Sequence, residues 1–235
     1  MTAPENIYRM PDDFTGRVRL FPLPNVVMFP HVLQPLHIFE PRYRAMLEEA
    51  LATDQMVAMA ILAPGWEADY EGRPALDPVA CLGRIATHNK LENGRYNVLL
   101  AGMKRIHLTK ELDTDKPFRE AMVEIVEDCY PAESTSRRPA LEQKLLDSFK
   151  RLLPKVPEAL EPLERLLAGQ VELGTLTDII SYTLDIGLEC KLALLREPNV
   201  DERARLLIGH LQTARSLTIP GMPKPRGFPP EFSVN

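Results

Sequence analysis

Prolines interrupt the apolar segment from Leu20 to Tyr43 so often that a long central strand cannot form there. A proline lacks the backbone N–H that a sheet ladder needs, so the apolar runs between prolines must form short edge or corner strands. The prolines concerned are Pro22, Pro24, Pro30 and Pro35. The next one, Pro41, stands where a helix can begin.

The residues after Pro41 predict one helix, one buried strand and a loop. Apolar positions at helical spacing form the stripe Tyr43, Met46, Leu47, Ala50 and Leu51. The short apolar run from Met56 to Leu62 predicts a strand covered on both faces, which we expect beside the strand of residues 36–39. Proline and glycine among acidic residues then predict a long surface loop over residues 63–78.

Asn93-Gly94 gives the strongest local prediction, a hairpin between strands at 79–91 and 95–100. Gly102 predicts a bulge or bend before a further strand at 103–110. A last strand is expected at 118–127. Strands in this order with one early helix predict a β-rich half that curls into a partly closed barrel.

A turn-rich segment at 131–139 marks the predicted domain junction. Leucines at helical spacing follow it in three stripes, at 141–153, 160–167 and 176–184. We expect four or five helices, one of them starting near Thr175 and the last near Asn199, and Gly169 as a helix end. Prolines then predict an extended or disordered tail. The predicted divisions are an extension at 1–16, a β-rich domain at 17–130, a helical bundle at 131–217 and a proline-rich tail at 218–235.

Several of these segments, taken in order, resemble the N-terminal domain of Lon protease, also called its substrate-binding domain. They are Leu23-Pro24, Phe29-Pro30, Leu36 to Phe39, Glu40 to Tyr43, Gly83 to Ile85, Gly94 to Ile106 and Glu197 to Arg203. The resemblance covers residues 17 to 212, more weakly in the second half. It implies an α+β fold, in which a PUA-like β-rich pseudo-barrel precedes an α-helical bundle, and a role in recognising polypeptides.

In full Lon protease, an ATPase module and a Ser-Lys peptidase module follow this domain, and this sequence shows neither of them. No G-x-x-x-x-G-K-[ST] segment is present to bind phosphates, and no G-x-S-x-G elbow or paired cysteine and base offers a nucleophile. We therefore predict a protein that is not an enzyme and uses no cofactor.

Composition and charge exclude several other classes. A net charge of −5 with basic and acidic residues interspersed argues against nucleic acid as the partner. Three scattered cysteines support neither a disulfide framework nor a zinc site. No signal-peptide pattern or membrane-spanning apolar run is present, so we expect a cytoplasmic protein without membrane contact.

An aromatic pair in the predicted loop gives the best candidate binding site. Trp66 and Tyr70 present large apolar area to a partner, although burial of Trp66 against the barrel is the favoured alternative. Met28, Phe29 and Met56 are further candidates for an adaptable apolar groove, with core packing again favoured. Arg84 belongs to a rival small-molecule pocket and is the remaining candidate binding residue.

Histidines offer the only candidate metal site. His31 and His37 share a face of an extended segment whereas Glu40, the third member, points to the other face, and His88 and His107 could come near them. Isolated histidines bound to backbone partners are the favoured interpretation, and we predict no metal ligand.

The function that we predict is non-catalytic recognition of unfolded or exposed apolar polypeptide segments, with protein quality control as its setting. The rivals are a scaffold that docks one specific partner, and a small-molecule or metal-binding protein with a pocket near His31, His37 and His88. The client, the oligomeric state and any separate protease stay open at this point.

Overall fold

The computed structural model describes residues 7–69, 72–152 and 171–213. These residues form two compact units, one ending at Val126 and the next beginning at Glu127, a few residues before the predicted junction. The first unit is the β-rich one and the second is helical. None of the helices within the described ranges is long and apolar enough to cross a membrane.

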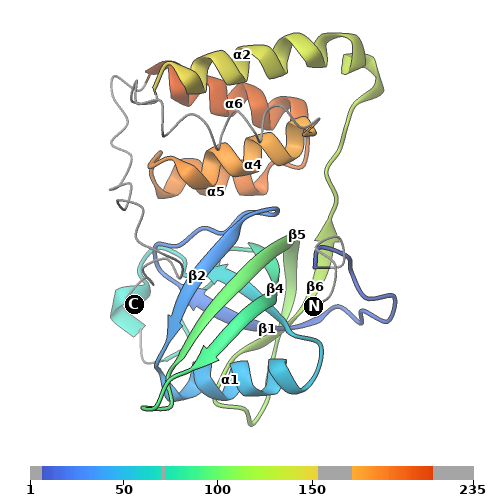
Figure 1. The fold of residues 1–235 in the computed structure, drawn as a ribbon. Helices are drawn as coiled ribbons and strands as arrows, with labels where there is room; N and C mark the ends of the chain where they lie inside the picture. The colour runs from blue at the N-terminus through green and yellow to red at the C-terminus, as the bar shows by residue number, and fades with distance from the viewer. Residues whose placement is uncertain (1–6, 70–71, 153–170, 214–235) are drawn as a thin grey trace. The chain divides into compact units, whose positions relative to one another are not determined.

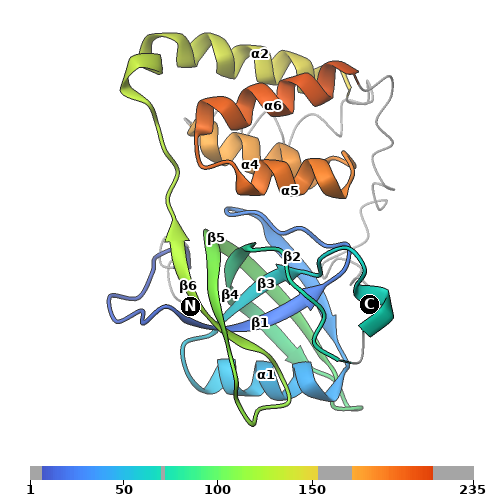
Figure 2. The ribbon, with the colours of Figure 1, turned by 180° about the vertical axis from the view of Figure 1, so that it is seen from behind.

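Six strands form the first unit, and five of them pair in a ring (Figures 1 and 2). The ring runs from β1 through β3, β4, β5 and β6 back to β1. The sixth strand, β2, is not part of this ring, because it pairs with β5 alone among the described strands and lies at the edge of the sheet. The bounds are β1 Arg17–Leu23, β2 Leu33–Ile38, β3 Met56–Ile61, β4 Val79–Lys90, β5 Tyr96–Leu112 and β6 Glu120–Val126. The predicted α+β fold with a β-rich pseudo-barrel is confirmed.

The prolines of the opening segment occupy positions that a strand tolerates. Pro35 lies in β2, which has a paired neighbour on one side only, and Pro22 lies near the end of β1. Pro24 and Pro30 lie outside the strands.

The predicted neighbour of the 56–62 strand is wrong. β3 pairs in parallel with β1 and antiparallel with β4, whereas β2 pairs with β5. Two parallel strands need a crossover, which the chain between β1 and β3 supplies with helix α1, Pro41–Ala52. An apolar run predicts that a strand is buried but not which strand it joins.

Helix α1 covers one end of the barrel (Figures 1 and 2). The stripe predicted for it is buried at Tyr43, Met46, Leu47 and Ala50. Near its C-terminal end the almost buried Arg19 of β1 donates hydrogen bonds to Glu49, Thr53 and Asp54. This guanidinium joins the helix to the first strand.

The bulge predicted at Gly102 is confirmed, because the register of β5 against β4 shifts there, from Leu82 opposite Lys104 to Gly83 opposite Gly102. The strand is not divided, since β5 runs on through this position. The Gly102 backbone exchanges hydrogen bonds with the segment before β2, accepting from His31 N–H at 2.9 Å and donating to Val32 O at 2.9 Å. A Cβ at this position would lie 2.0 Å from Phe29 O, so the close approach of two backbones requires glycine. The Asn93-Gly94 hairpin is confirmed, with Gly94 at φ +75°.

The helical unit contains α2 Arg138–Lys150, α4 Leu173–Thr183, α5 Leu188–Arg196 and α6 Val200–Thr213. Helix α6 contacts the other three. Asn199 caps α6 as predicted, since its side-chain oxygen accepts from Asp201 N and Glu202 N. The start predicted at Thr175 is wrong: α4 begins at Leu173, because apolar residues continue the buried face before that threonine.

The sequence patterns did not predict α5, whose nine residues are too few for a clear stripe. The predicted stripe at 160–167, the helix end at Gly169 and the proline-rich tail lie outside the described residues.

Candidate functional site

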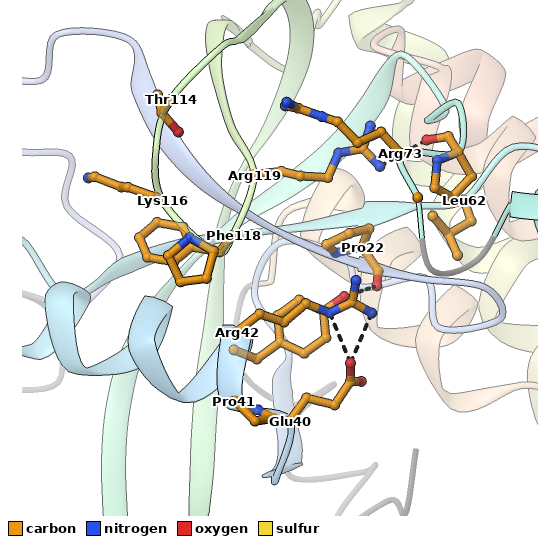
Figure 3. A pocket seen from close by; sticks show the side chains of 14 residues that line it. Pro22, Glu40, Pro41, Arg42, Leu62, Arg73, Thr114, Lys116, Phe118 and Arg119 are labelled. Carbon is orange, nitrogen blue, oxygen red and sulfur yellow. Dashed lines mark hydrogen bonds and ion pairs between the residues drawn. The ribbon is translucent and has the colours of Figure 1, made fainter.

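A pocket of about 560 Å³ opens on the barrel unit where four separate segments of the chain meet (Figure 3). These segments are the end of β1, the start of α1, the region of the 63–78 loop (Leu62 just before it and residues 72–74 within it), and the turn that joins β5 to β6. The lining residues are Pro22, Glu40, Pro41, Arg42, Tyr43, Leu62, Gly72, Arg73, Pro74, Thr114, Lys116, Pro117, Phe118 and Arg119. The volume lies within the range of small-ligand sites.

Buried apolar groups make the floor of this pocket. Leu62, Tyr43 and Phe118 are each less than 7% exposed. The Tyr43 ring packs edge-on against Phe21 with centroids 4.4 Å apart, and its hydroxyl donates to Pro22 O at 3.3 Å. The floor is therefore part of the core and is fixed in position.

Basic side chains stand around the floor. In Figure 3, Arg73 and Arg119 lie on one side and Arg42 with its partner Glu40 on the other. The Lys116 ammonium lies 5.3 Å from the centre of the Phe118 ring, within cation–π distance. It also donates to Glu49 of α1 at 2.7 Å.

Glu111 of β5 orients two of the arginines. Arg119 and Arg73 both donate to this carboxylate, and Arg119 also donates to Pro74 O at 2.8 Å. Burial raises the pKa of Glu111, but the hydrogen bonds from Arg119 and Arg73 together lower this pKa by more than burial raises it, so the net shift is downward. The carboxylate is ionised at neutral pH and holds both guanidinium groups in place.

The candidate binding residues that lie within the described ranges do not line this pocket. Met28, Phe29 and Met56 are buried in the barrel core, each at most 3% exposed. Arg84 is partly buried on β4, Trp66 is partly buried in the short helical turn Trp66–Asp69, and Tyr70 lies outside the described residues. What the structure adds is that Leu62, just before the loop containing Trp66, and Gly72 to Pro74, later in that loop, line the pocket.

The three histidines do not converge on a metal site. His37 and Asn97 face each other across β2 and β5, with His37 Nδ1 2.8 Å from Asn97 Oδ1. His88 pairs in register with Val98, the next residue of β5, so its side chain lies on the opposite face of the sheet. Within the described ranges, no group of three potential metal ligands is present.

Comparison with known proteins gives the family. The model of the ATP-dependent protease La (LON) substrate-binding domain matches residues 17–213. The chain is 28% identical over 191 residues to Lon protease of Xanthomonas oryzae pv. oryzae, and 25% identical over 206 residues to Lon protease 2 of Myxococcus xanthus. These matches cover 81% and 88% of this chain but only 22% and 24% of those relatives.

Solved structures agree on the fold. The N-terminal domain of Mycobacterium avium complex Lon protease matches with a TM-score of 0.65 at 16% identity, over 84% of this chain and 98% of that one. A Lon N-terminal domain protein from Xanthomonas campestris matches with a TM-score of 0.58 at 19% identity, over 82% and 97%. The chain therefore belongs to the family of LON substrate-binding domains.

Proposed function

We propose that this chain binds segments of other polypeptides without cutting them, and that the barrel pocket is where they bind. One observation carries the proposal: a rigid apolar floor and several oriented basic groups converge at one opening in a domain of the LON substrate-binding family. A floor of core side chains loses little entropy when a ligand covers it. Proteases act on polypeptides, so a segment of polypeptide is the ligand that the family description suggests.

Filling the pocket tests the site. Thr114 lines it, whereas the nearby Asp115 does not and is exposed. We expect Thr114→Trp to weaken binding of a reduced, carbamidomethylated probe protein by about tenfold or more, equivalent to about 1.4 kcal/mol. Asp115→Trp should leave binding unchanged.

The measurement is fluorescence anisotropy of the labelled probe, with the native, disulfide-intact form of the same protein as the second ligand. Equal affinity of the Thr114→Trp and Asp115→Trp variants would remove the pocket from the proposal. A separate Trp66→Ala variant reports whether the adjoining loop takes part in binding.

The absence of cleavage needs its own assay. We expect mass spectrometry to show the probe protein intact after long incubation with this chain, with and without ATP. A pull-down then separates two settings: many unfolded clients favour general recognition in quality control, whereas one stoichiometric partner favours an assembly scaffold.

A further inference from the structure

The charges that line the barrel pocket are unbalanced. Four lining residues are basic and one, Glu40, is acidic. Glu40 accepts from Arg42 Nε at 2.9 Å, so its charge is already paired. Among the described lining residues, no further carboxylate is left to balance Arg73, Lys116 and Arg119.

The carboxylates that hold these three groups stand outside the lining. Glu111 serves both Arg73 and Arg119, while Glu49 and Glu120 accept from Lys116 at 2.7 and 3.2 Å. This arrangement orients the basic head groups without covering the opening. A single negative charge on Glu111 is shared between two guanidinium groups.

Two N–H groups of the Arg119 guanidinium are available to a ligand. Its side chain is only 13% exposed, and its hydrogen bonds use Nε, Nη1 and Nη2 once each. A guanidinium carries five N–H groups, so two of them have no acceptor in the described part of the chain. A carboxylate is the group that matches a guanidinium edge best.

We infer that the pocket selects polypeptide segments in which a carboxylate stands beside an apolar side chain. The apolar group covers Phe118 and Leu62, and the carboxylate reaches Arg119 and Lys116. This inference rests on the proposed function and adds the class of ligand: acidic-apolar segments rather than purely apolar ones.

The test changes the ligand first, so that it does not depend on any variant folding. Three labelled peptides alternate leucine or phenylalanine with glutamate, with glutamine, or with lysine. We expect the glutamate peptide to bind about tenfold or more tightly than the glutamine peptide, with the lysine peptide weakest. Added salt should reduce the difference, because part of the interaction is between charges near the surface.

A protein variant then locates the preference. Arg119→Gln should reduce the ratio of glutamate to glutamine affinity toward one, while Arg205→Gln, which removes an exposed arginine of α6, should leave the ratio unchanged. Circular dichroism of each variant checks the fold. Because Arg119 is nearly buried, Lys116→Gln is a second variant, and its ratio should fall in the same direction.

The outcomes separate the two proposals. Equal affinity of wild type for the glutamate and glutamine peptides would overturn the acidic preference and leave polypeptide binding in place. If Arg119→Gln and Lys116→Gln both keep the full preference for the glutamate peptide, the inference is also overturned, because the glutamate side chains would then bind to other residues. Failure of all three peptides and of the unfolded probe protein to bind would overturn the proposed function itself.

Discussion

Arg203 of α6 donates to Asp128 at 2.6 and 2.9 Å and ties the first residues of the helical unit to its last described helix. The Arg203 side chain is completely buried, and it also donates to Thr177 Oγ1 at 3.0 Å and to Glu197 O at 2.9 Å. One guanidinium thus connects α6, α4 and the segments before α2 and α6. When one partner of a buried ion pair is removed, the remaining buried charge loses its compensation and the fold is strongly destabilised.

We expect Arg203→Leu to destabilise the helical unit by about 3 kcal/mol or more, since the change removes the buried guanidinium from which the Asp128 carboxylate accepts two hydrogen bonds. Urea unfolding followed by far-UV circular dichroism measures this, because helices dominate that signal. Fluorescence of Trp66, the only tryptophan, reports the barrel unit separately.

Arg205 on the same helix provides the matched control. It pairs with Glu202 at 2.6 Å, but both side chains are about half exposed. Arg205→Leu should change the free energy of unfolding by less than about 1 kcal/mol. Similar losses for Arg203→Leu and Arg205→Leu would contradict the role assigned to the buried pair.

Gly174 of α4 lies directly against this ion pair. A Cβ there would stand 2.4 Å from Asp128 Oδ2 and 2.6 Å from the Tyr130 hydroxyl. Gly174→Ala should therefore destabilise the helical unit by about 1–3 kcal/mol, although alanine favours helix. Gly209 of α6 has open space around it, so Gly209→Ala should stabilise the unit by about 0.5–1 kcal/mol. Opposite shifts in the urea midpoint are the expected result.

Local patterns predicted the elements better than their partners. The prolines indicated short strands, the stripe after Pro41 indicated α1, and Asn93-Gly94 indicated the hairpin, because each pattern acts within a few residues. The pairing of β3 with β1 depends on a crossover through α1. The need for glycine at position 102 is also a long-range effect, because the backbone that a side chain there would meet belongs to Phe29.

The pocket escaped prediction because its parts are far apart in the sequence. Arg42, Arg73 and Arg119 come from three segments, each of which resembles an ordinary charged surface when taken alone. The Trp66 loop was the nearest correct signal, because Gly72, Arg73 and Pro74 of that loop line the opening. The run from Lys116 to Arg119 places two cations, a proline and an aromatic ring in one turn, which is the local signal that could have indicated a site.

The cap of α6 should contribute measurably to stability. Asn199 accepts from the backbone N–H groups of Asp201 at 3.0 Å and Glu202 at 3.2 Å. Asn199→Ala removes this acceptor and should destabilise the helical unit by about 1 kcal/mol, whereas Asn199→Asp keeps an oxygen in place. Thermal unfolding of the two variants checks this, and an aspartate variant as unstable as the alanine one would contradict capping.

The barrel unit should lose stability in acid through Glu120. Burial raises the pKa of this nearly buried carboxyl, but hydrogen bonds from Arg17 at 2.7 Å and Lys116 at 3.2 Å lower the pKa by more than burial raises it. The pKa in the folded state is therefore below the ordinary 4.5. A pKa that is lower in the folded state means that the ionised group stabilises the fold above pH 4.5. That contribution disappears as the pH falls through the folded-state pKa.

Glu120→Gln removes the titrating group, so its free energy of unfolding should depend less steeply on pH below 4.5 than that of wild type. Arg17→Gln removes one of the two donors and should give an intermediate slope. Urea unfolding followed by Trp66 fluorescence at a series of pH values measures all three proteins. Parallel curves for wild type and Glu120→Gln would show that this carboxylate does not stabilise the barrel, and that other acidic groups cause the acid sensitivity.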